Sequence, residues 1–250
     1  MRFTSFVVAS LALVVNARLD KGSLFGPFDA LHQAIKPTMD NLPSHNVVSR
    51  RPVEVPQICK DHSGDFGVGD PSTGVTCNGL EAEEVQYDDC GQPWVVCRCQ
   101  DANLSMDKLV ELVGKVPPAS RSYVRSFLAT QAPGCSGVCF DGNFVRLNGE
   151  CDMFVLMHEV GHALDDGYPD WPPFLDAVNG DSCVPDDYGN TNYVEEFAQM
   201  YAMVASGFFS GTIPADFTCL KKQFDTLWND WRIQEALGAP GCLPDKKPAL

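Results

Sequence analysis

Apolar positions recur at helical spacing in several stretches of the chain. Between residues 105 and 116, apolar side chains fall three or four positions apart, and Pro117-Pro118 then ends the predicted helix. Tyr123 and Phe127 share one face of a second short segment. The same spacing predicts helices over residues 120–128, 152–165, 193–206 and 216–237.

Short β-prone runs predict a small amount of sheet. Residues 94–97 have the composition of a buried strand. Residues 138–140 and 143–147 flank Asp141-Gly142, a pair that tolerates positive φ, so we expect a hairpin there. Residues 60–93 and 169–189 are predicted as loops, with short strands in the first and about one helical turn in the second. The prediction is an α+β fold, helix-rich with a small β-sheet or hairpin.

The amino-terminal residues have the pattern of a secretory signal peptide. Arg2 precedes an apolar run over residues 6–15, and Val15 and Ala17 stand at the small-residue positions of a cleavage site. No run reaches the roughly 20 apolar residues that a membrane span requires. We therefore expect residues 1–17 to be a leader, the protein to be secreted, and no membrane partner.

Cysteine usage agrees with export. The chain has 11 cysteines, and an oxidising compartment would pair most of them. Because the number is odd, at least one thiol stays unpaired within the chain. Cys97 with Cys99, or Cys135 with Cys139, could instead bind a structural metal. The fold is thus predicted to be stapled by disulfides.

Charge and cysteine position divide the chain. Basic side chains outnumber acidic ones in residues 18–51, whereas acidic ones prevail afterwards, and no cysteine precedes Cys59. Residues 18–51 are therefore predicted to be a propeptide or flexible arm, and residues 52–250 the folded domain. The net charge of −15 disfavours nucleic acid as a partner.

The strongest chemical signal is His158-Glu159-Val160-Gly161-His162. On a helix, two histidines four residues apart lie on one face and can bind one Zn²⁺ together. Glu159 lies next to the first histidine, where its carboxylate would reach a zinc-bound water and act as general base. The pattern predicts a metal-dependent hydrolase with one zinc per chain.

A zinc hydrolase needs a third protein ligand, and no histidine follows His162. That ligand should be a carboxylate from a second helix packed against the first. Glu195 and Glu196 lie about 100° apart on the predicted helix over residues 193–206, so only one can face the histidines. We favour Glu195, with Glu196 as the alternative. The full set of candidates is Asp165, Asp166, Asp170, Asp186, Asp187, Glu195 and Glu196.

Residues 158–166 and 188–198 together resemble the catalytic domain of anthrax lethal factor and its relatives. In that family the third zinc ligand is a Glu seven residues after a catalytic Tyr, and Tyr188 and Glu195 have this spacing. The resemblance implies a zincin-like fold, Glu195 as ligand and Tyr188 as a donor to the developing oxyanion. Gln199 stands where the family has an acid.

Two other resemblances bear on the interpretation. The stretch from Cys97-Arg98-Cys99 through residues 117–125 resembles secreted conidiation-specific proteins of filamentous fungi, which indicates a fungal source. Fungal deuterolysin-type peptidases use an Asp three residues before a Tyr-Gly pair, but Pro185 occupies that position before Tyr188-Gly189. The deuterolysin pattern is therefore the weaker alternative.

The sequence thus predicts a secreted, monomeric zinc metalloendopeptidase that acts on peptide or protein substrates. His158, His162 and Glu195 would bind zinc, with Glu159 as base and Tyr188 as oxyanion donor. We expect the strand near Phe144 to form the edge that aligns an extended peptide. The alternative is a non-catalytic secreted cysteine-rich protein, an effector or surface protein, with a structural or vestigial metal site.

Overall fold

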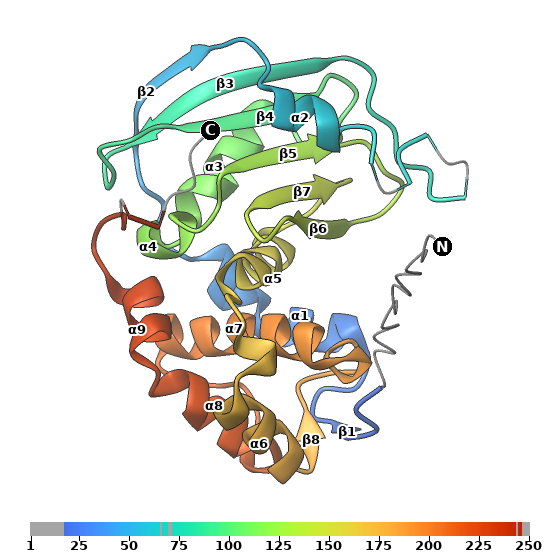
Figure 1. Cartoon of the computed structure of the whole chain (residues 1–250), viewed down its shortest axis with the longest axis vertical. Coiled ribbons are helices and arrows are strands. Elements are labelled where there is room, and N and C mark those ends of the chain that lie inside the picture. Colours follow the sequence, from blue (N-terminus) through green and yellow to red (C-terminus); the bar gives the residue numbers. More distant parts are fainter. Residues whose placement is uncertain (1–17, 66, 70–71, 244, 247–250) are drawn as a thin grey trace, which may run out of the picture.

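A six-stranded mixed sheet forms one half of the molecule (Figure 1). The computed structural model describes residues 18–65, 67–69, 72–243 and 245–246. The pairs β4–β5 and β5–β7 are parallel, and the remaining pairs of the sheet are antiparallel. In spatial order they are β2 (Val47–Pro52), β3 (Leu80–Tyr87), β4 (Trp94–Cys99), β5 (Ser126–Thr130), β7 (Phe144–Asn148) and β6 (Ser136–Phe140).

The central strands are apolar because both of their faces are covered. β5 and β7 are buried at every position, and β4 is buried at all positions but one. Two helices, α3 (Met106–Lys115) and α4 (Pro118–Arg121), form the crossover that the parallel pair β4–β5 requires. The predicted helix over residues 120–128 is wrong: α4 has four residues, and Phe127 lies in β5. β5 lies between its parallel neighbours β4 and β7, and Phe127 is completely buried there.

The predicted hairpin is confirmed. β6 and β7 pair antiparallel around Asp141 and Gly142, whose φ angles are 50° and 65°. The strand at the edge of the sheet is β6, however, whereas Phe144 belongs to β7 and is covered by β5 and β6. The expectation that the strand near Phe144 forms the edge is therefore wrong, and the edge is the neighbouring strand β6.

Helices form the other half of the molecule, below the sheet in Figure 1. The single helix predicted over residues 216–237 is two helices, because Asp230 breaks the run and caps the second through the amide of Arg232. A nine-residue helix also replaces the predicted turn in residues 169–189. The elements are α5 (Met153–Leu164), α6 (Pro172–Gly180), α7 (Tyr193–Ser210), α8 (Lys221–Trp228) and α9 (Trp231–Gly238).

Residues 18–51 have a packed place, which the expectation of a flexible arm did not foresee. β1 (Gly22–Ser23) pairs with β8 (Cys183–Val184) in the helical half, and β2 is the outer strand of the sheet. Between them, α1 (Phe28–Asp40) contacts α5 and α7 and buries Leu31, Ile35 and Met39 completely. The apolar face of α1 supplies the energy that holds this segment. Whether the segment is removed by processing stays a prediction.

The disulfide-stapled α+β class is confirmed. All eleven cysteines lie in the described residues, and Cys139 is the one left unpaired. The alternative of a structural metal on Cys97 with Cys99, or on Cys135 with Cys139, is wrong, because Cys97, Cys99 and Cys135 are each bonded to another cysteine. No helix among the described residues is long and apolar enough to cross a membrane. The predicted leader, residues 1–17, lies outside the described residues. The pairs are Cys59–Cys97, Cys77–Cys99, Cys90–Cys242, Cys135–Cys151 and Cys183–Cys219.

Candidate metal centre

Helix α5 lies between the sheet and the helical half (Figure 1). Asp152 caps its first turn by accepting a hydrogen bond from the amide of Phe154, and the residues that follow are buried through Leu156 and Met157. The helix carries His158, Glu159 and His162 as the sequence predicted. Burial on both sides fixes the direction in which these three side chains can point.

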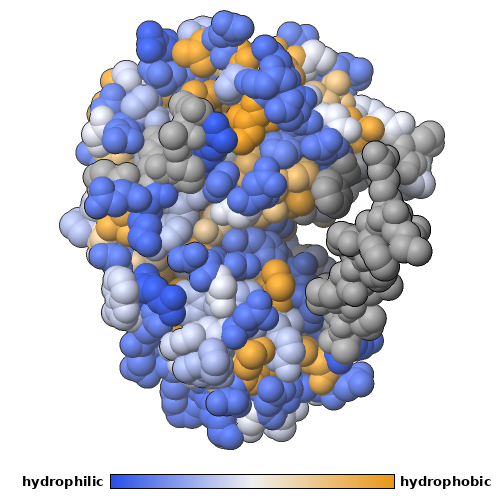
Figure 2. All heavy atoms as spheres, in the orientation of Figure 1, coloured by the Kyte–Doolittle hydropathy of each residue, from blue (hydrophilic) through white to orange (hydrophobic). Residues whose placement is uncertain are grey.

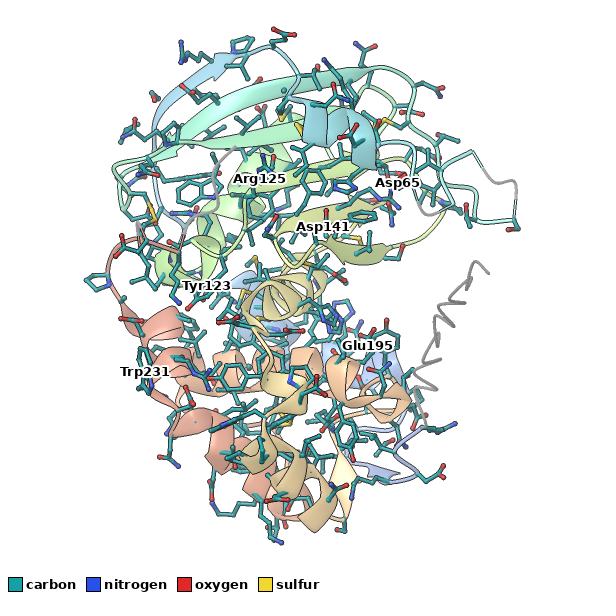
Figure 3. All side chains as sticks on the ribbon, in the orientation of Figure 1. Asp65, Tyr123, Arg125, Asp141, Glu195 and Trp231 are labelled. Atoms are coloured by element: carbon teal, nitrogen blue, oxygen red, sulfur yellow. A yellow bond between two sulfur atoms is a disulfide. The ribbon has the colours of Figure 1, made fainter. Side chains whose placement is uncertain are left out.

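Helix α7 crosses α5 at a point where no side chain separates their backbones. A Cβ atom on Gly161 would lie 3.2 Å from the Cα atom of Ala198, which is tighter than ordinary packing allows. Asn192 caps α7 by accepting hydrogen bonds from the amides of Val194 and Glu195. The close crossing brings Glu195 in the first turn of α7 against α5 (Figure 3).

Three side-chain atoms from the two helices meet at one point. The Nε2 atoms of His158 and His162 lie 3.1 Å apart, and Glu195 Oε2 lies 3.2 Å and 3.3 Å from them. Donor atoms at about 2.0–2.1 Å from a tetrahedral Zn²⁺ lie about 3.3–3.4 Å from one another. The three atoms therefore have the spacing of three corners of a zinc tetrahedron, and this donor set fits the metal.

The charges at this point support one another. Burial by itself raises the pKa of the Glu195 carboxyl, but the two imidazoles outweigh burial and bring it down to about 2. Burial by itself lowers the pKa of His158, but Glu195 and Glu159 outweigh burial and raise it. The site thus favours positive charge between the carboxylate and the imidazoles, as a cation would require.

Glu159 lies beside the three donors without joining them. Its side chain packs against Gly137 of β6, where any side chain would collide with the carboxylate. Its Oε2 atom is buried and has no hydrogen-bond partner among the described residues. Burial raises the pKa of this carboxyl, and the nearby His158 and His162 oppose that rise. A buried carboxylate with a free acceptor can take up a proton from a substrate or water.

Tyr188 completes the predicted set. It lies at the start of a 3₁₀ turn, Gly189–Thr191, and its ring centroid is 5.6 Å from that of His158. The residue as a whole remains 39% exposed. Burial of the hydroxyl, followed by the charges of Glu195 and Glu159, raises its pKa. The hydroxyl therefore keeps its proton at neutral pH and can donate a hydrogen bond.

The partner on the far side of His158 is Gln199, which stands where the lethal factor resemblance has an acid, and the residue behind it, Asp186, is the part that the sequence did not indicate. The Nδ1 atom of His158 lies 2.9 Å from Gln199 Oε1, and Gln199 Nε2 donates to Asp186 Oδ2 over 2.6 Å. Asp186 had been a candidate ligand, and it lies behind the histidine instead. Gln199 lies one turn after Glu195 on the same face of the helix, which the sequence shows, but no local pattern connects it with Asp186.

The other carboxylates considered as third ligand do not join the three donors. Glu196, the alternative to Glu195, is completely buried and packs against Gly189, and burial raises its pKa well above the usual value. In the part of the chain that the structure describes, the metal-compatible group at this point contains Glu195 alone among the acids. The remaining candidates that lie outside it are Asp165, Asp166, Asp170, Asp186 and Asp187.

Two cavities flank the donors and share Gly137, Glu159 and Tyr188 as lining residues. One has a volume of about 180 Å³ and extends toward Val155 and the Cys135–Cys151 disulfide. The other has a volume of about 390 Å³ and extends toward Glu195, His162 and the unpaired Cys139. The surface of this face is largely hydrophilic and is hollowed between the two halves at the level of α5 (Figure 2). The site is therefore open to a ligand from outside.

Two further groups of acids, histidines and cysteines have donor atoms close together, and both are less suited to a metal. In one, Cys90 and Cys242 form a disulfide and cannot act as thiolates. The other group consists of His45, Asp88 and Asp89, and its Asp89 already forms an ion pair with the buried guanidinium of Arg121. Among the described residues, the group on α5 and α7 therefore has the best donor set.

Comparison with known proteins identifies relatives. The family model described as conidiation-specific protein Con-13 matches residues 28–231. Conidiation-specific protein 13 of Neurospora crassa is 29% identical over 212 residues, which cover 77% of this chain and 58% of that protein. No solved structure matches.

The matches correct one resemblance and confirm the other. The likeness to the catalytic domain of anthrax lethal factor is wrong as an assignment of family, because the matching family model is a different one and no solved structure matches. The likeness to fungal conidiation-specific proteins is confirmed. The zincin fold stays a prediction. The names of these relatives state no reaction.

Proposed function

This chain belongs to the Con-13 family of conidiation-specific proteins, and we propose that it is a zinc-dependent hydrolase of peptide bonds. One observation carries the proposal: two imidazole nitrogens and one carboxylate oxygen lie 3.1–3.3 Å apart, with Glu159 beside them. Three protein donors leave the fourth position of a tetrahedral zinc site open, as hydrolases require. The corresponding cofactor is one Zn²⁺ per chain.

The proposed metal supplies Lewis-acid chemistry: it would polarise the scissile carbonyl and make a water nucleophilic at neutral pH. Glu159 has the free acceptor atom that takes the proton from the attacking water. Because its pKa is raised by burial, the same carboxyl can then return the proton to the leaving amine. Tyr188, whose hydroxyl stays protonated, donates to the oxygen on which negative charge develops.

The sheet supports a peptide as substrate. β6 is the outer strand, and Ser136, Gly137, Val138 and Cys139 line the two cavities beside the donors. A strand with an unpaired edge can add an extended peptide through backbone hydrogen bonds. Absence of a side chain at Gly137 lets such a peptide approach Glu159.

Secretion and the remaining partners belong to the same proposal. The disulfides are compatible with an oxidising compartment. The net charge of −15 disfavours nucleic acid and anionic lipid surfaces. We propose a secreted monomer that meets its peptide or protein substrate outside the cell. The chain spans 58% of the length of its Neurospora relative, so nothing about that whole protein's activity is carried over.

The second candidate is a non-catalytic, cysteine-rich secreted protein that retains zinc structurally or not at all. The family match favours it, because the relatives' names carry no reaction. The two candidates share the donor set and differ in the role of Glu159. A structural site has no need of a buried carboxylate with an unused oxygen beside the metal ligands.

Metal analysis and a protease assay separate the two candidates. Wild-type protein should hold one zinc per chain, and His162→Ala should lose it. Glu159→Gln should keep the zinc but lower kcat/KM by about 10²–10⁴-fold, since it removes the proton acceptor. Glu150→Gln makes the same chemical change at an exposed position before α5 and should leave both properties unchanged. Wild-type protein that binds zinc tightly but cleaves no peptide would favour the non-catalytic candidate.

A further inference from the structure

A continuous chain of hydrogen bonds leads from His158 to the loop that carries Tyr188. His158 Nδ1 lies 2.9 Å from Gln199 Oε1, and Gln199 Nε2 lies 2.6 Å from Asp186 Oδ2. The other oxygen of Asp186 accepts the backbone amides of Tyr188 and Gly189, each over 3.0 Å. His158, Gln199 and Asp186 are all buried, with exposures of 4%, 0% and 0%.

The chemistry of the three groups allows only one direction of donation along this chain. A carboxylate only accepts hydrogen bonds, so the NH₂ end of Gln199 must face Asp186. The carbonyl end of Gln199 then faces His158, and an amide carbonyl only accepts. His158 must therefore carry a proton on Nδ1, so the neutral form of the ring has its lone pair on Nε2, the atom that faces Glu195 and His162.

The loop that Asp186 holds is also fixed from the opposite side, by residues 18–26. The amide of Asp187 donates to Gly26 O over 2.8 Å, and Asn190 Nδ2 donates to Lys21 O over 2.7 Å. Asp186 therefore sits inside a closed network rather than on a mobile surface loop. A change at Asp186 would act through its two hydrogen-bonded neighbours.

We propose that Asp186 is a positioning residue that sets the ring tautomer of His158 through Gln199 and, with its other oxygen, places Tyr188. One carboxylate thereby links a metal ligand on α5 to the oxyanion donor, although it touches neither zinc nor substrate. The proposal rests on the proposed function for its effect on zinc, but the tautomer can be measured in the metal-free protein.

Reversing the polarity of the chain tests the proposal. In Asp186→Asn, the new Oδ1 can still accept the amides of Tyr188 and Gly189, but the new NH₂ faces the NH₂ of Gln199. Gln199 relieves that conflict by turning over, which presents its NH₂ to His158. The imidazole must then accept at Nδ1 and carry its proton on Nε2, where a metal ligand needs a lone pair.

The measurements are ¹⁵N NMR of the histidine rings in the metal-free chain at alkaline pH, where the imidazoles are neutral, and titration with Zn²⁺ against a chelator. Wild type should show His158 protonated on Nδ1, with the resonance identified by its loss in His158→Gln. Asp186→Asn should shift the proton to Nε2 and weaken zinc binding about 10–100-fold. Asp187→Asn, the same change on the exposed neighbour, should leave the tautomer and the affinity unchanged.

A double variant provides the rescue that a merely structural role would not. In Asp186→Asn with Gln199→Glu, the carboxylate at position 199 accepts from both His158 Nδ1 and the new amide, so the original tautomer and most of the zinc affinity should return. Unchanged affinity in Asp186→Asn, or a double variant no better than the single one, would overturn the proposal.

Two further outcomes are distinguishable. If Asp186→Asn does not fold, Gln199→Met breaks the chain from α7 without touching the loop, and it should give the same loss of zinc affinity; wild-type affinity there would overturn the proposal. If wild-type protein binds no zinc, the proposed function fails. A tautomer that still follows Asp186 in the metal-free chain would then support the positioning role by itself.

Discussion

The sheet half and the helical half of the molecule are held together by different means. Four disulfides lie in the sheet half. Two join preceding segments to β4, Cys59–Cys97 and Cys77–Cys99. Cys90–Cys242 joins the turn between β3 and β4 to the chain after α9, and Cys135–Cys151 joins the two ends of the β6–β7 hairpin. In the helical half, Cys183–Cys219 is the single crosslink, and α7 is held by a long buried face. The sheet half thus combines its buried strands with four crosslinks, whereas the helical half relies mainly on packing.

The candidate site lies where these halves meet, and each half supplies part of it. α5 carries His158 and His162 between them, α7 brings Glu195 from the helical half, and β6 forms the wall at Gly137. Its geometry therefore depends on how the halves are placed relative to each other. The comparison teaches that a change far from the donors can disable the site if it moves one half.

The segment over residues 18–51 crosses both halves, so its removal should have the largest effect. A chain of residues 52–250 lacks Leu31, Ile35 and Met39, each of which would cost about 2–5 kcal/mol on truncation to alanine. Their sum is comparable to the whole stability of a domain. We expect no cooperative thermal unfolding for this chain, and a normal transition for the control, residues 18–250.

A chain of residues 52–250 that unfolds at the control's temperature would restore the interpretation of residues 18–51 as a removable propeptide. It would also show that α1 contributes nothing to the contact between the halves. Circular dichroism and calorimetry on both chains make the comparison directly.

Removing one disulfide from each half should separate stability from site geometry. Cys183→Ser with Cys219→Ser opens a loop of 36 residues and should cost about 4 kcal/mol, and Cys77→Ser with Cys99→Ser opens one of 22 and should cost about 3 kcal/mol. Cys183 directly precedes the loop of Asp186 and Tyr188. We expect zinc affinity to fall only in the first variant.

Denaturant unfolding measures the stability of these disulfide variants, and competition with a chelator measures their zinc affinity. Equal zinc affinity in the two double variants would contradict the expectation that the Cys183–Cys219 crosslink, and not the Cys77–Cys99 crosslink, supports the loop of Asp186 and Tyr188. A loss in the Cys77 and Cys99 variant instead would assign that control to the sheet.

The smallest effect concerns the contact between α1 and the start of α5. Burial raises the pKa of Asp152, but hydrogen bonds from Lys36 and His32 outweigh burial and lower it. Because the folded pKa lies below the unfolded value of about 3.9, this stability is present at neutral pH and is lost as pH falls below that value. Asp152→Ala should cost about 1 kcal/mol at pH 7, mainly through the lost cap.

Asp152→Asn keeps a good cap but removes the charge, so it isolates the contribution of Lys36 and His32. Its unfolding free energy should change less between pH 6 and pH 3 than that of wild type. Identical pH dependence in the two proteins would show that the tether between α1 and α5 contributes no electrostatic stability.

The sequence by itself determined what depends on neighbours a few residues apart. The four-residue spacing of His158 and His162 places both on one face of a helix wherever that helix lies. The hairpin around Asp141-Gly142 and the helix over residues 106–115 follow from equally local patterns, and the odd number of cysteines required an unpaired one. The family likeness to lethal factor rested on two short segments and was wrong, because short motifs recur in unrelated families.

Only the tertiary structure decided the contacts between distant segments. Glu195 rather than Glu196 meets the histidines because α7 crosses α5 at Gly161, and Asp186 reaches His158 only through Gln199. The same holds for the disulfide partners and for the packing of α1, which charge and cysteine position had assigned to a flexible arm. Such contacts depend on how helices and strands pack, and no local period along the chain encodes that.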